Sequence, residues 1–227
     1  MGTKNIDIAI IGAGLTGLTT AFWLTRSGKQ IQIIEKQDRA GGQIRTFQEN
    51  GFVYESGPNT GVVSYPEVAE LFAALSPDCT LETAREESKK RWIWKDNKFH
   101  ALPSGLVSAV TTPLFTLYDK FRILGEPFRA KGTNPDESVA ELAARRLGKS
   151  FVDYAVDPFL SGVYAGNPHT LVTRHALPKL YNLEQDYGSF IKGTIAKAKL
   201  PKSERDKLAT KKVFSAVGGL ERLAEAL

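Results

Sequence analysis

The sequence predicts an α/β fold in which a domain with a parallel sheet is interrupted by a mostly helical insertion. Three observations support this prediction. An apolar strand at 6–11 runs directly into a glycine-rich turn and a helix, the pattern over 103–200 is mainly helical, and a strand with a glycine turn returns at 212–219. Hydrophobic residues make up 42% of the 227 residues, enough for a core in one large domain or two small ones.

The first elements alternate strand, turn, helix and strand. Ile6–Ile11 has the apolar run of a buried parallel strand. Leu15–Ser27 has apolar residues at helical spacing, and Gly28 is its stop. Gln30–Ile34 is a second apolar strand, which ends at Glu35. This order predicts a βαβ unit.

The turn at 12–17 has the G-x-G-x-x-G spacing of a Rossmann-like, dinucleotide-binding turn. Gly12 allows the tight turn, Gly14 lets a pyrophosphate approach the backbone, and Gly17 lets the helix pack closely on the strand. The helix N-terminus offers free N–H groups to the phosphates. Glu35 follows the next strand, where a carboxylate accepts hydrogen bonds from ribose hydroxyls. The remaining predicted contacts here are Leu15, Thr16 and Lys36. A glycine turn without a ligand is the alternative.

The next segments predict short strands and one helix. Phe52–Glu55 is expected to be a strand, and Pro66–Leu75 a helix that begins with proline. Arg91–Trp94 and Phe99–Leu102 alternate in polarity around Asp96-Asn97, which predicts a hairpin.

Helical patterns dominate the middle of the chain. Asn134-Pro135 predicts the cap of a helix that runs to Leu147, and a second helix is expected at Ser150–Leu160. Leu114–Phe128 has Leu, Tyr and Phe at helical spacing with basic residues between them. A helix packed on its own core and a helix at a membrane interface both fit that pattern.

The end of the chain predicts a return to the first domain. Lys197–Lys212 is expected to be a basic loop, Lys212–Ala216 a strand, Gly218-Gly219 a turn and Leu220–Leu227 the start of a helix. A domain that ends on a fresh helix is expected to be truncated at its C-terminus.

Composition restricts location and partners. The net charge is +5, and the basic excess lies in 89–131 and 187–227. Nucleic acid, an anionic membrane surface, an acidic small molecule and a merely solvated basic face could each account for it.

Cys79 is the single cysteine, so the chain cannot form an internal disulfide. The apolar run Ile8–Ile11 ends at Gly12, so no signal peptide is expected, and no apolar run approaches the ~20 residues of a membrane span. We therefore expect a cytoplasmic protein, or one that lies on a membrane without crossing it.

The segment after Glu35 decides which dinucleotide is expected. Residues 36–46, K-Q-D-R-A-G-G-Q-I-R-T, resemble the R-x-G-G-x-x-x-T signature of the flavoprotein family that includes amine oxidases and phytoene desaturases. Residues 55–58, E-S-G-P, resemble the turn that runs past the flavin in that family. The resemblance implies FAD. It adds Gly41, Gly42, Arg45, Gly57 and Pro58 to the cofactor-binding residues.

Longer segments resemble the oxygen-dependent protoporphyrinogen oxidases within that family. The four that match are 57–60 (G-P-N-T), 90–106 with its L-P-x-G-L exit, 157–168 (D-P-F-L-S-G-V-Y-A-G-N-P) and 214–220 (F-S-A-V-G-G-L). The third is the most specific because it is long and distinctive. The similarity covers essentially the whole chain.

This resemblance implies FAD-dependent oxidation of protoporphyrinogen IX in haem biosynthesis, with dioxygen as acceptor. Arg91 would pair with a propionate of the substrate, and Asn59 and Gly162 would contact the tetrapyrrole. No protein side chain is expected to act as a catalytic acid, base or nucleophile, because the flavin supplies the chemistry. No metal is expected either, because no set of His, Cys and Asp residues in the sequence has metal-ligand spacing. Three alternatives stay open: oxidation of coproporphyrinogen III, another flavin oxidase or desaturase, and an inactive FAD-binding fragment.

The resemblance also implies an organisation. Residues 1–87 would begin the FAD-binding domain, 88–211 would form the substrate- and membrane-binding domain, and 212–227 would return to the first domain. The family is roughly twice this length, in keeping with a truncated chain. The stretch 114–128 resembles the family's membrane-binding region, which suggests peripheral attachment at the inner face of the cell membrane. A homodimer is a further open alternative, and no nucleic-acid partner is expected.

Overall fold

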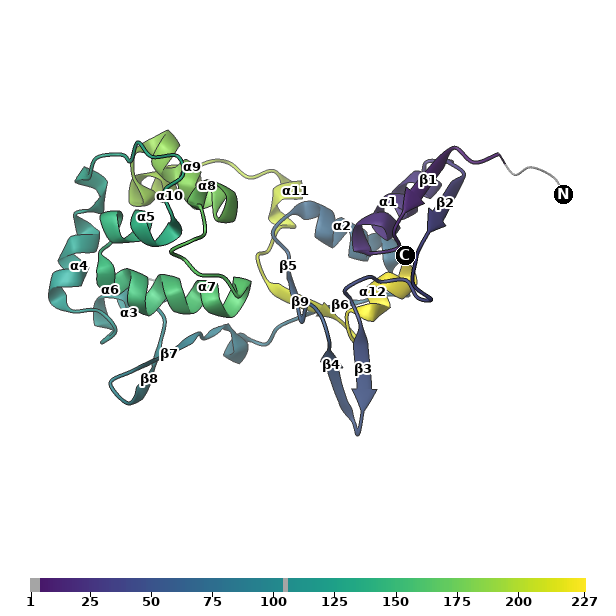
Figure 1. Ribbon diagram of the computed structural model, residues 1–227, viewed down its shortest axis with the longest axis horizontal. Helices are drawn as coiled ribbons and strands as arrows, with labels where there is room; N and C mark the ends of the chain where they lie inside the picture. The colour runs from purple at the N-terminus through teal and green to yellow at the C-terminus, as the bar shows by residue number, and fades with distance from the viewer. Residues whose placement is uncertain (1–4, 104–105) are drawn as a thin grey trace. The chain divides into compact units, whose positions relative to one another are not determined.

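The computed structural model describes residues 5–103 and 106–227 (Figure 1). They form two compact units, one of residues 5–86 with 202–227 and the other of residues 87–201. The first unit mixes strands and helices and the second, the helical unit, is mainly helical, so the fold is mixed α/β. Ser104 and Gly105, part of the L-P-x-G-L segment, lie outside the described residues.

The first unit contains a parallel strand pair, a hairpin and a three-stranded sheet. Its elements are β1 (Ile8–Ile11), α1 (Leu15–Arg26), β2 (Ile31–Ile34), β3 (Thr46–Glu49), β4 (Phe52–Glu55), β5 (Gly61–Val62), α2 (Pro66–Leu75), β6 (Leu81–Thr83), α11 (Glu204–Lys207), β9 (Val213–Ala216) and α12 (Glu221–Ala226). β1 pairs in parallel with β2 in the register Ile8 to Ile31, and β3 pairs antiparallel with β4. The predicted βαβ unit forms, with each strand slightly shorter than expected.

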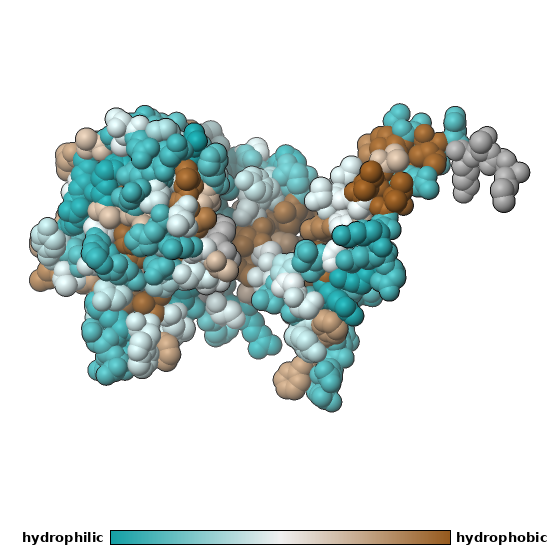
Figure 2. Space-filling view, in the orientation of Figure 1, coloured by the Kyte–Doolittle hydropathy of each residue, from teal (hydrophilic) through white to brown (hydrophobic). Residues whose placement is uncertain are grey.

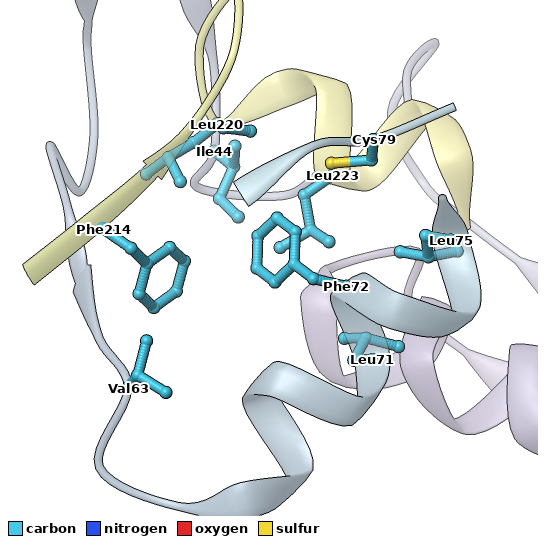
Figure 3. Packing of buried hydrophobic residues seen from close by; sticks show 10 residues of the cluster. Ile44, Val63, Leu71, Phe72, Leu75, Cys79, Phe214, Leu220 and Leu223 are labelled. Carbon is cyan, nitrogen blue, oxygen red and sulfur yellow. The ribbon is translucent and has the colours of Figure 1, made fainter. Parts of the chain in front are cut away.

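The returning strand β9 lies between β5 and β6, antiparallel to both. Its Phe214 packs edge-on against Phe72 of α2, with ring centroids 5.3 Å apart (Figure 3). The buried cluster around this pair also includes Ile44, Val63, Leu71, Leu75, Cys79, Ala216, Leu220 and Leu223. Segments far apart in the sequence therefore share the core of this unit.

Polar contacts fix the end of the chain to the β3–β4 hairpin. The Thr46 hydroxyl donates to the Glu55 carboxylate at 2.8 Å, and Glu55 accepts the Leu220 N–H at 2.8 Å. Thr46 N–H donates to the Glu221 carboxylate at 3.1 Å, while Glu221 N–H donates to the Thr46 hydroxyl at 3.0 Å. A Cβ on Gly219 would come within 2.2 Å of the Thr46 side chain, so this close approach requires glycine.

The parallel pair leaves apolar side chains in solvent. Ile11 of β1 is 88% exposed and Ile34 of β2 is 51% exposed. Figure 2 shows hydrophobic residues gathered over these two strands. Strands of a parallel sheet are normally buried on both faces, so this pair is covered far less than is usual for its kind.

The helical unit begins with a hairpin and continues as short helices. Its elements are η1 (Glu86–Lys89, which spans the boundary), β7 (Trp92–Lys95), β8 (Lys98–Ala101), α3 (Leu106–Thr111), α4 (Leu117–Leu124), η2 (Glu126–Phe128), α5 (Val139–Arg146), α6 (Lys149–Phe151), the π-helix η3 (Val152–Val156), α7 (Asp157–Tyr164), α8 (Thr173–Ala176), α9 (Pro178–Tyr187) and α10 (Phe190–Ala198). The predicted hairpin forms, and Asp96 and Asn97 take left-handed φ values of 51° and 57° in its turn.

Three sequence expectations for helices are corrected. α5 starts after Ser138, which forms a reciprocal capping box with Glu141, so the cap is not Asn134. Helix α4 covers only Leu117–Leu124, because Thr116 caps its start through a capping box with Asp119 and Gly125 is its C-cap. The expected helix at 150–160 belongs to a longer run, α6, η3 and α7, that includes a π-helical turn.

The expected loop at 197–212 also differs, because α11 lies within it. Arg205 of α11 forms ion pairs with Glu67 at 2.7 Å and with Glu70 at 2.6 Å, both in α2. These contacts join α11 to α2 of the first unit. The compact units therefore divide at 201/202, whereas the sequence suggests 211/212.

Buried charges organise the helical unit. Arg146 and Glu126 are fully buried and pair at 2.6 Å, and Arg146 also pairs with buried Glu184 at 2.9 Å. Glu126 accepts the Ser189 hydroxyl at 2.5 Å and the Phe190 N–H at 2.9 Å. Burial raises the pKa of Glu126, but its hydrogen bonds from Ser189, Phe190 and Arg146 outweigh that effect, and the net pKa is lowered.

Candidate functional site: a cavity between two glycine turns

The first glycine turn follows β1 directly. Gly12 has a φ of +99°, a conformation that glycine adopts without strain. A Cβ on Gly17 would lie 2.0 Å from the Gly12 carbonyl oxygen and 3.3 Å from the Ile10 side chain. Gly12 and Gly17 therefore act through turn geometry and close packing.

Helix α1 begins without a side-chain cap. Its N-cap is Gly14, no side chain caps it, and no acidic residue lies in its first turn. A Cβ on Gly14 would meet nothing within 4 Å, so there is open space beside this residue. Free N–H groups and the positive end of the helix dipole meet in that space, where they favour an anionic group such as a phosphate.

Glu35 turns its carboxylate toward this glycine turn. It accepts the Gln37 N–H at 2.9 Å and the Ala13 N–H at 2.6 Å. The hydrogen bond from Gln37, followed by that from Ala13, lowers the pKa of Glu35 below its ordinary value. The carboxylate is therefore ionised at neutral pH and held within reach of a ligand on the turn.

A second glycine turn lies against the first. Gly41 and Gly42 have φ values of +101° and +59°, and Gly41 N–H donates to the Ala13 carbonyl at 2.8 Å. A Cβ on Gly42 would lie 3.1 Å from Gly14 Cα. Arg39 secures this turn through hydrogen bonds to the carbonyls of Gly42 at 2.7 Å and Ile44 at 3.0 Å. Arg39 is not among the predicted site residues. It could have been found from the sequence, because it is the arginine of the R-x-G-G pattern.

The two turns enclose a cavity of about 510 Å³. It brings together seven of the predicted cofactor residues: Gly14, Leu15, Glu35, Lys36, Gly41, Gly42 and Pro58. Gln37, Gln43 and Ile44 also line it and were not predicted, because they have no signature of their own. A helix N-terminus that no side chain caps, a carboxylate and a pair of glycines meet here. These features fit the ADP part of a dinucleotide.

The other predicted cofactor residues lie outside the lining. Gly12, Thr16 and Gly17 build the first turn, as described. A Cβ on Gly57 would lie 2.0 Å from the Gln43 carbonyl oxygen, so Gly57 permits close packing of two turns. Arg45 is exposed, and its guanidinium stacks 4.7 Å from the Phe47 ring centroid.

The predicted substrate residues are divided between the units. Asn59 lines a separate cavity of about 420 Å³ in the first unit, with Glu55, Glu82 and Gly218 among its other walls. Arg91 and Gly162 belong to the helical unit. Arg91 is exposed, and its guanidinium lies 5.3 Å from the Phe159 ring centroid. Gly162 is exposed, and a Cβ there would meet nothing within 4 Å.

No helix within 5–103 or 106–227 is both long and apolar enough to cross a bilayer. In the same ranges, no group of three His, Cys, Asp or Glu side chains is arranged to hold a metal ion.

Comparison with known proteins places this geometry in a family. The family model for flavin-containing amine oxidoreductases matches residues 15–227. The chain is 32% identical to protoporphyrinogen oxidase 2, chloroplastic/mitochondrial, of Arabidopsis thaliana over 97% of this chain and 46% of that protein. It is 29% identical to coproporphyrinogen III oxidase of Bacillus subtilis over 100% of this chain and 51% of that one.

A solved structure gives the same result. A crystal structure assigned to a protoporphyrinogen oxidase from Exiguobacterium sp. 255-15 aligns with a TM-score of 0.67 and 26% identity, over 99% of this chain and 50% of that one. The chain thus spans about half the length of the relatives it matches. It belongs to the flavin-containing amine oxidoreductase family and is protoporphyrinogen oxidase-like within it.

Proposed function

We propose that this chain holds the ADP part of FAD in the cavity between its two glycine turns. The observation that carries the proposal is the convergence of the uncapped α1 N-terminus, the ionised Glu35 and the Gly41-Gly42 turn on one space. The α1 N–H groups would bind the pyrophosphate, and Glu35 would accept hydrogen bonds from the ribose. Family membership supports a flavin as the ligand.

We further propose that the protein takes part in oxidising protoporphyrinogen IX to protoporphyrin IX. Relatives named protoporphyrinogen oxidase support this choice of substrate. The exposed guanidinium of Arg91 in the helical unit supports it as well. Arg91 would bind a propionate through charge-assisted hydrogen bonds. Its contact with Phe159 presents the guanidinium beside an aromatic ring, which suits an amphipathic macrocycle.

The chemistry divides between cofactor and protein. When bound, the flavin would supply hydride acceptance from meso carbons of the porphyrinogen; each hydride removed is matched by one proton released to water, and dioxygen would be the final acceptor, leaving as hydrogen peroxide. The chain's own residues would bind and orient: Gly14 and Glu35 would fix one end of the cofactor, and Arg91 would fix a carboxylate of the substrate. No step of this proposal requires a protein acid or base.

Purification of the chain and a visible spectrum test the first proposal. Bound or acquired FAD should give a flavin spectrum, and its absence even after FAD is added would contradict the proposal. Porphyrin fluorescence in air then tests the second. FAD-loaded chain should form protoporphyrin, and Arg91→Ala should slow this at least tenfold by removing a charged contact, with flavin still bound. Equal activity of Arg91→Ala would remove the assignment of Arg91.

The same assay separates the alternatives. Faster turnover of coproporphyrinogen III would favour that substrate, in line with the Bacillus subtilis relative. Turnover of neither porphyrinogen, but of an amine or a carotenoid precursor, would indicate another member of the family. Flavin uptake without any turnover would identify a cofactor-binding fragment.

A specific observation also supports peripheral attachment to an anionic membrane, such as the inner face of the cell membrane. Leu117, Tyr118, Phe121 and Leu124 of α4, followed by Phe128, are each between 67% and 88% exposed. Exposure on this scale favours the interfacial reading of the pattern over a helix packed on its own core, because such a helix would bury these side chains. Lys120 and Arg122 lie between them.

Liposome flotation tests this attachment. The chain should float with vesicles that contain anionic lipid at low salt, and less so at high salt, since surface charges are screened. Phe121→Ser should weaken flotation. Leu208→Ser changes a similarly apolar residue of the first unit and should not. No flotation at low salt would end the proposal.

A further inference from the structure

A second cavity, of about 320 Å³, lies within the helical unit and differs from the glycine-turn cavity in chemistry. Every lining residue is Ala, Val, Leu or Phe. The lining side chains come from α5, α6, η3, α7, α9 and the first residue of α10, together with Leu102, Leu147 and Leu177. The cavity is partly open to solvent, so covering its apolar lining would be favourable.

The three aromatic walls of this cavity are each held by a partner. Phe151 stacks on buried Phe115, with ring centroids 5.5 Å apart. Arg91 lies 5.3 Å from the Phe159 ring centroid. The Phe190 ring has the Arg146 guanidinium 5.3 Å from its centroid.

The backbone beside Phe190 is also fixed, since its N–H donates to buried Glu126 at 2.9 Å. Side chains held in this way cannot rotate freely into the space. The cavity is therefore preformed, as ligand cavities usually are.

One wall has an unusual backbone. Ala155 and Val156, both in the lining, belong to the π-helix η3 between α6 and α7. A π-helical turn is rare and occurs frequently at functional sites. This observation is independent of the cavity's size and also points to a binding site.

The lining chemistry restricts the ligand. A hydroxyl, amide or charged group placed inside would lose its hydrogen bonds to water without finding a side-chain partner. The cavity is more than twice the engineered apolar cavity of about 150 Å³ known to bind benzene. Its walls are mostly aliphatic, which matches a hydrocarbon chain. We infer that this cavity binds the alkyl chain of a small uncharged amphiphile whose polar end stays in solvent. This inference does not rest on the proposed function, because neither flavin nor porphyrinogen takes part in it.

Methyl NMR on the full 227-residue chain tests it, with 1-octanol as the probe. Saturable shifts are expected at the methyl groups of Val139, Leu147 and Leu180, which line the cavity. Leu117 and Leu124, exposed on α4, should not shift, which separates the cavity from that surface. The matched probe 1,8-octanediol must bury its second hydroxyl and should bind about tenfold more weakly.

Two variants sharpen the test. Ala143→Leu places extra carbon atoms in the cavity and should weaken octanol binding about tenfold, because it takes up volume that the ligand needs. Leu124→Ser is the surface control and should leave the affinity within about twofold. Should Ala143→Leu fail to fold, the comparison of octanol with octanediol decides without any variant.

The inference would be overturned by equal binding of octanol and octanediol, by shifts confined to α4, or by unchanged affinity in folded Ala143→Leu. A complete lack of saturable shifts would also overturn it, and would indicate that polypeptide side chains fill the cavity instead.

Discussion

The interiors of the two units differ in what holds them together. In the first unit an apolar cluster packs Phe72 against Phe214, and glycines allow backbone segments to touch. In the helical unit the fully buried Arg146 joins Glu126 and Glu184, which come from different elements. Apolar packing is sensitive to shape and volume, whereas a buried charge is sensitive to the loss of its partner. The two units should therefore be destabilised by different kinds of substitution.

The difference also separates their roles. The first unit offers a ligand the N-terminus of α1, which no side chain caps, and the Glu35 carboxylate beside it. In the helical unit the buried charges satisfy one another and fix the walls of an apolar cavity through Phe190. Its charges serve the scaffold, and the groups it offers to ligands are Arg91 and apolar side chains.

The largest effect is expected from Arg146→Met. The change removes the partner of two buried carboxylates and should destabilise the helical unit by about 3–5 kcal/mol. Hydrogen exchange across a urea titration, read separately on peptides of α5 and of α2, measures it. The α5 peptides should open at lower urea while the α2 peptides change little. An equal shift in both would mean that the two units unfold as one.

Gly17→Ala should lower the stability of the first unit, by less than Arg146→Met lowers that of the helical unit. Its Cβ would collide with the Gly12 carbonyl, so we expect a loss of about 2 kcal/mol together with the loss of ADP binding. Gly14→Ala is the matched control. Its Cβ meets no protein atom, so urea stability should hold while calorimetry shows weaker ADP binding. Wild-type ADP affinity in Gly14→Ala would contradict the assigned approach of the phosphates.

Low pH should destabilise the helical unit over a defined pH range. Burial raises the pKa of Glu184, but hydrogen bonds from Arg145 and the Gly132 N–H outweigh it, so its pKa, like that of Glu126, is lowered in the folded state. A carboxylate whose pKa is lowered in the folded state adds to the free energy of unfolding. Its full contribution is present above the pKa of the unfolded chain, near 4.5, and is lost as the pH falls through the pKa of the folded state.

Urea midpoints of the helical unit should therefore hold from pH 7 to about 5 and fall below about 4.5. Measurements on Glu126→Gln should show a weaker dependence over that lower range. An identical dependence in the variant would remove Glu126 as a source of the effect.

Arg205→Met should have the smallest effect. Its ion pairs with Glu67 and Glu70 are exposed, and pairs of this kind contribute little to stability. Urea midpoints of both units should stay within error of wild type. A clear loss in the first unit would show that α11 is essential for holding residues 202–211 in place.

The parts of the fold fixed by local chemistry could be predicted from the sequence. Strand β4 and helix α2 lie at the predicted residues, and the turn at 12–17 has the expected glycine geometry. These features follow from residues close together in the chain, where spacing and backbone preference decide the structure.

The parts fixed by distant residues could not be predicted. The Arg146–Glu126 pair joins residues 20 positions apart that look like ordinary surface charges in the sequence. Ser138, and not Asn134, is the N-cap of α5, because Glu141 completes the capping box with Ser138. In 114–128 the periodicity is that of an amphipathic helix, but only the structure shows that Leu114 is buried and Phe121 is exposed.

Competition between FAD and ADP tests the central claim most directly, since both should occupy the cavity between the glycine turns. Flavin fluorescence is followed as FAD binds to the chain, and ADP is then added. We predict that FAD binds, that ADP displaces it, and that Glu35→Gln weakens both ligands by about tenfold through loss of charge-assisted hydrogen bonds to the ribose. Failure of FAD to bind, or binding that ADP cannot displace, would contradict the account.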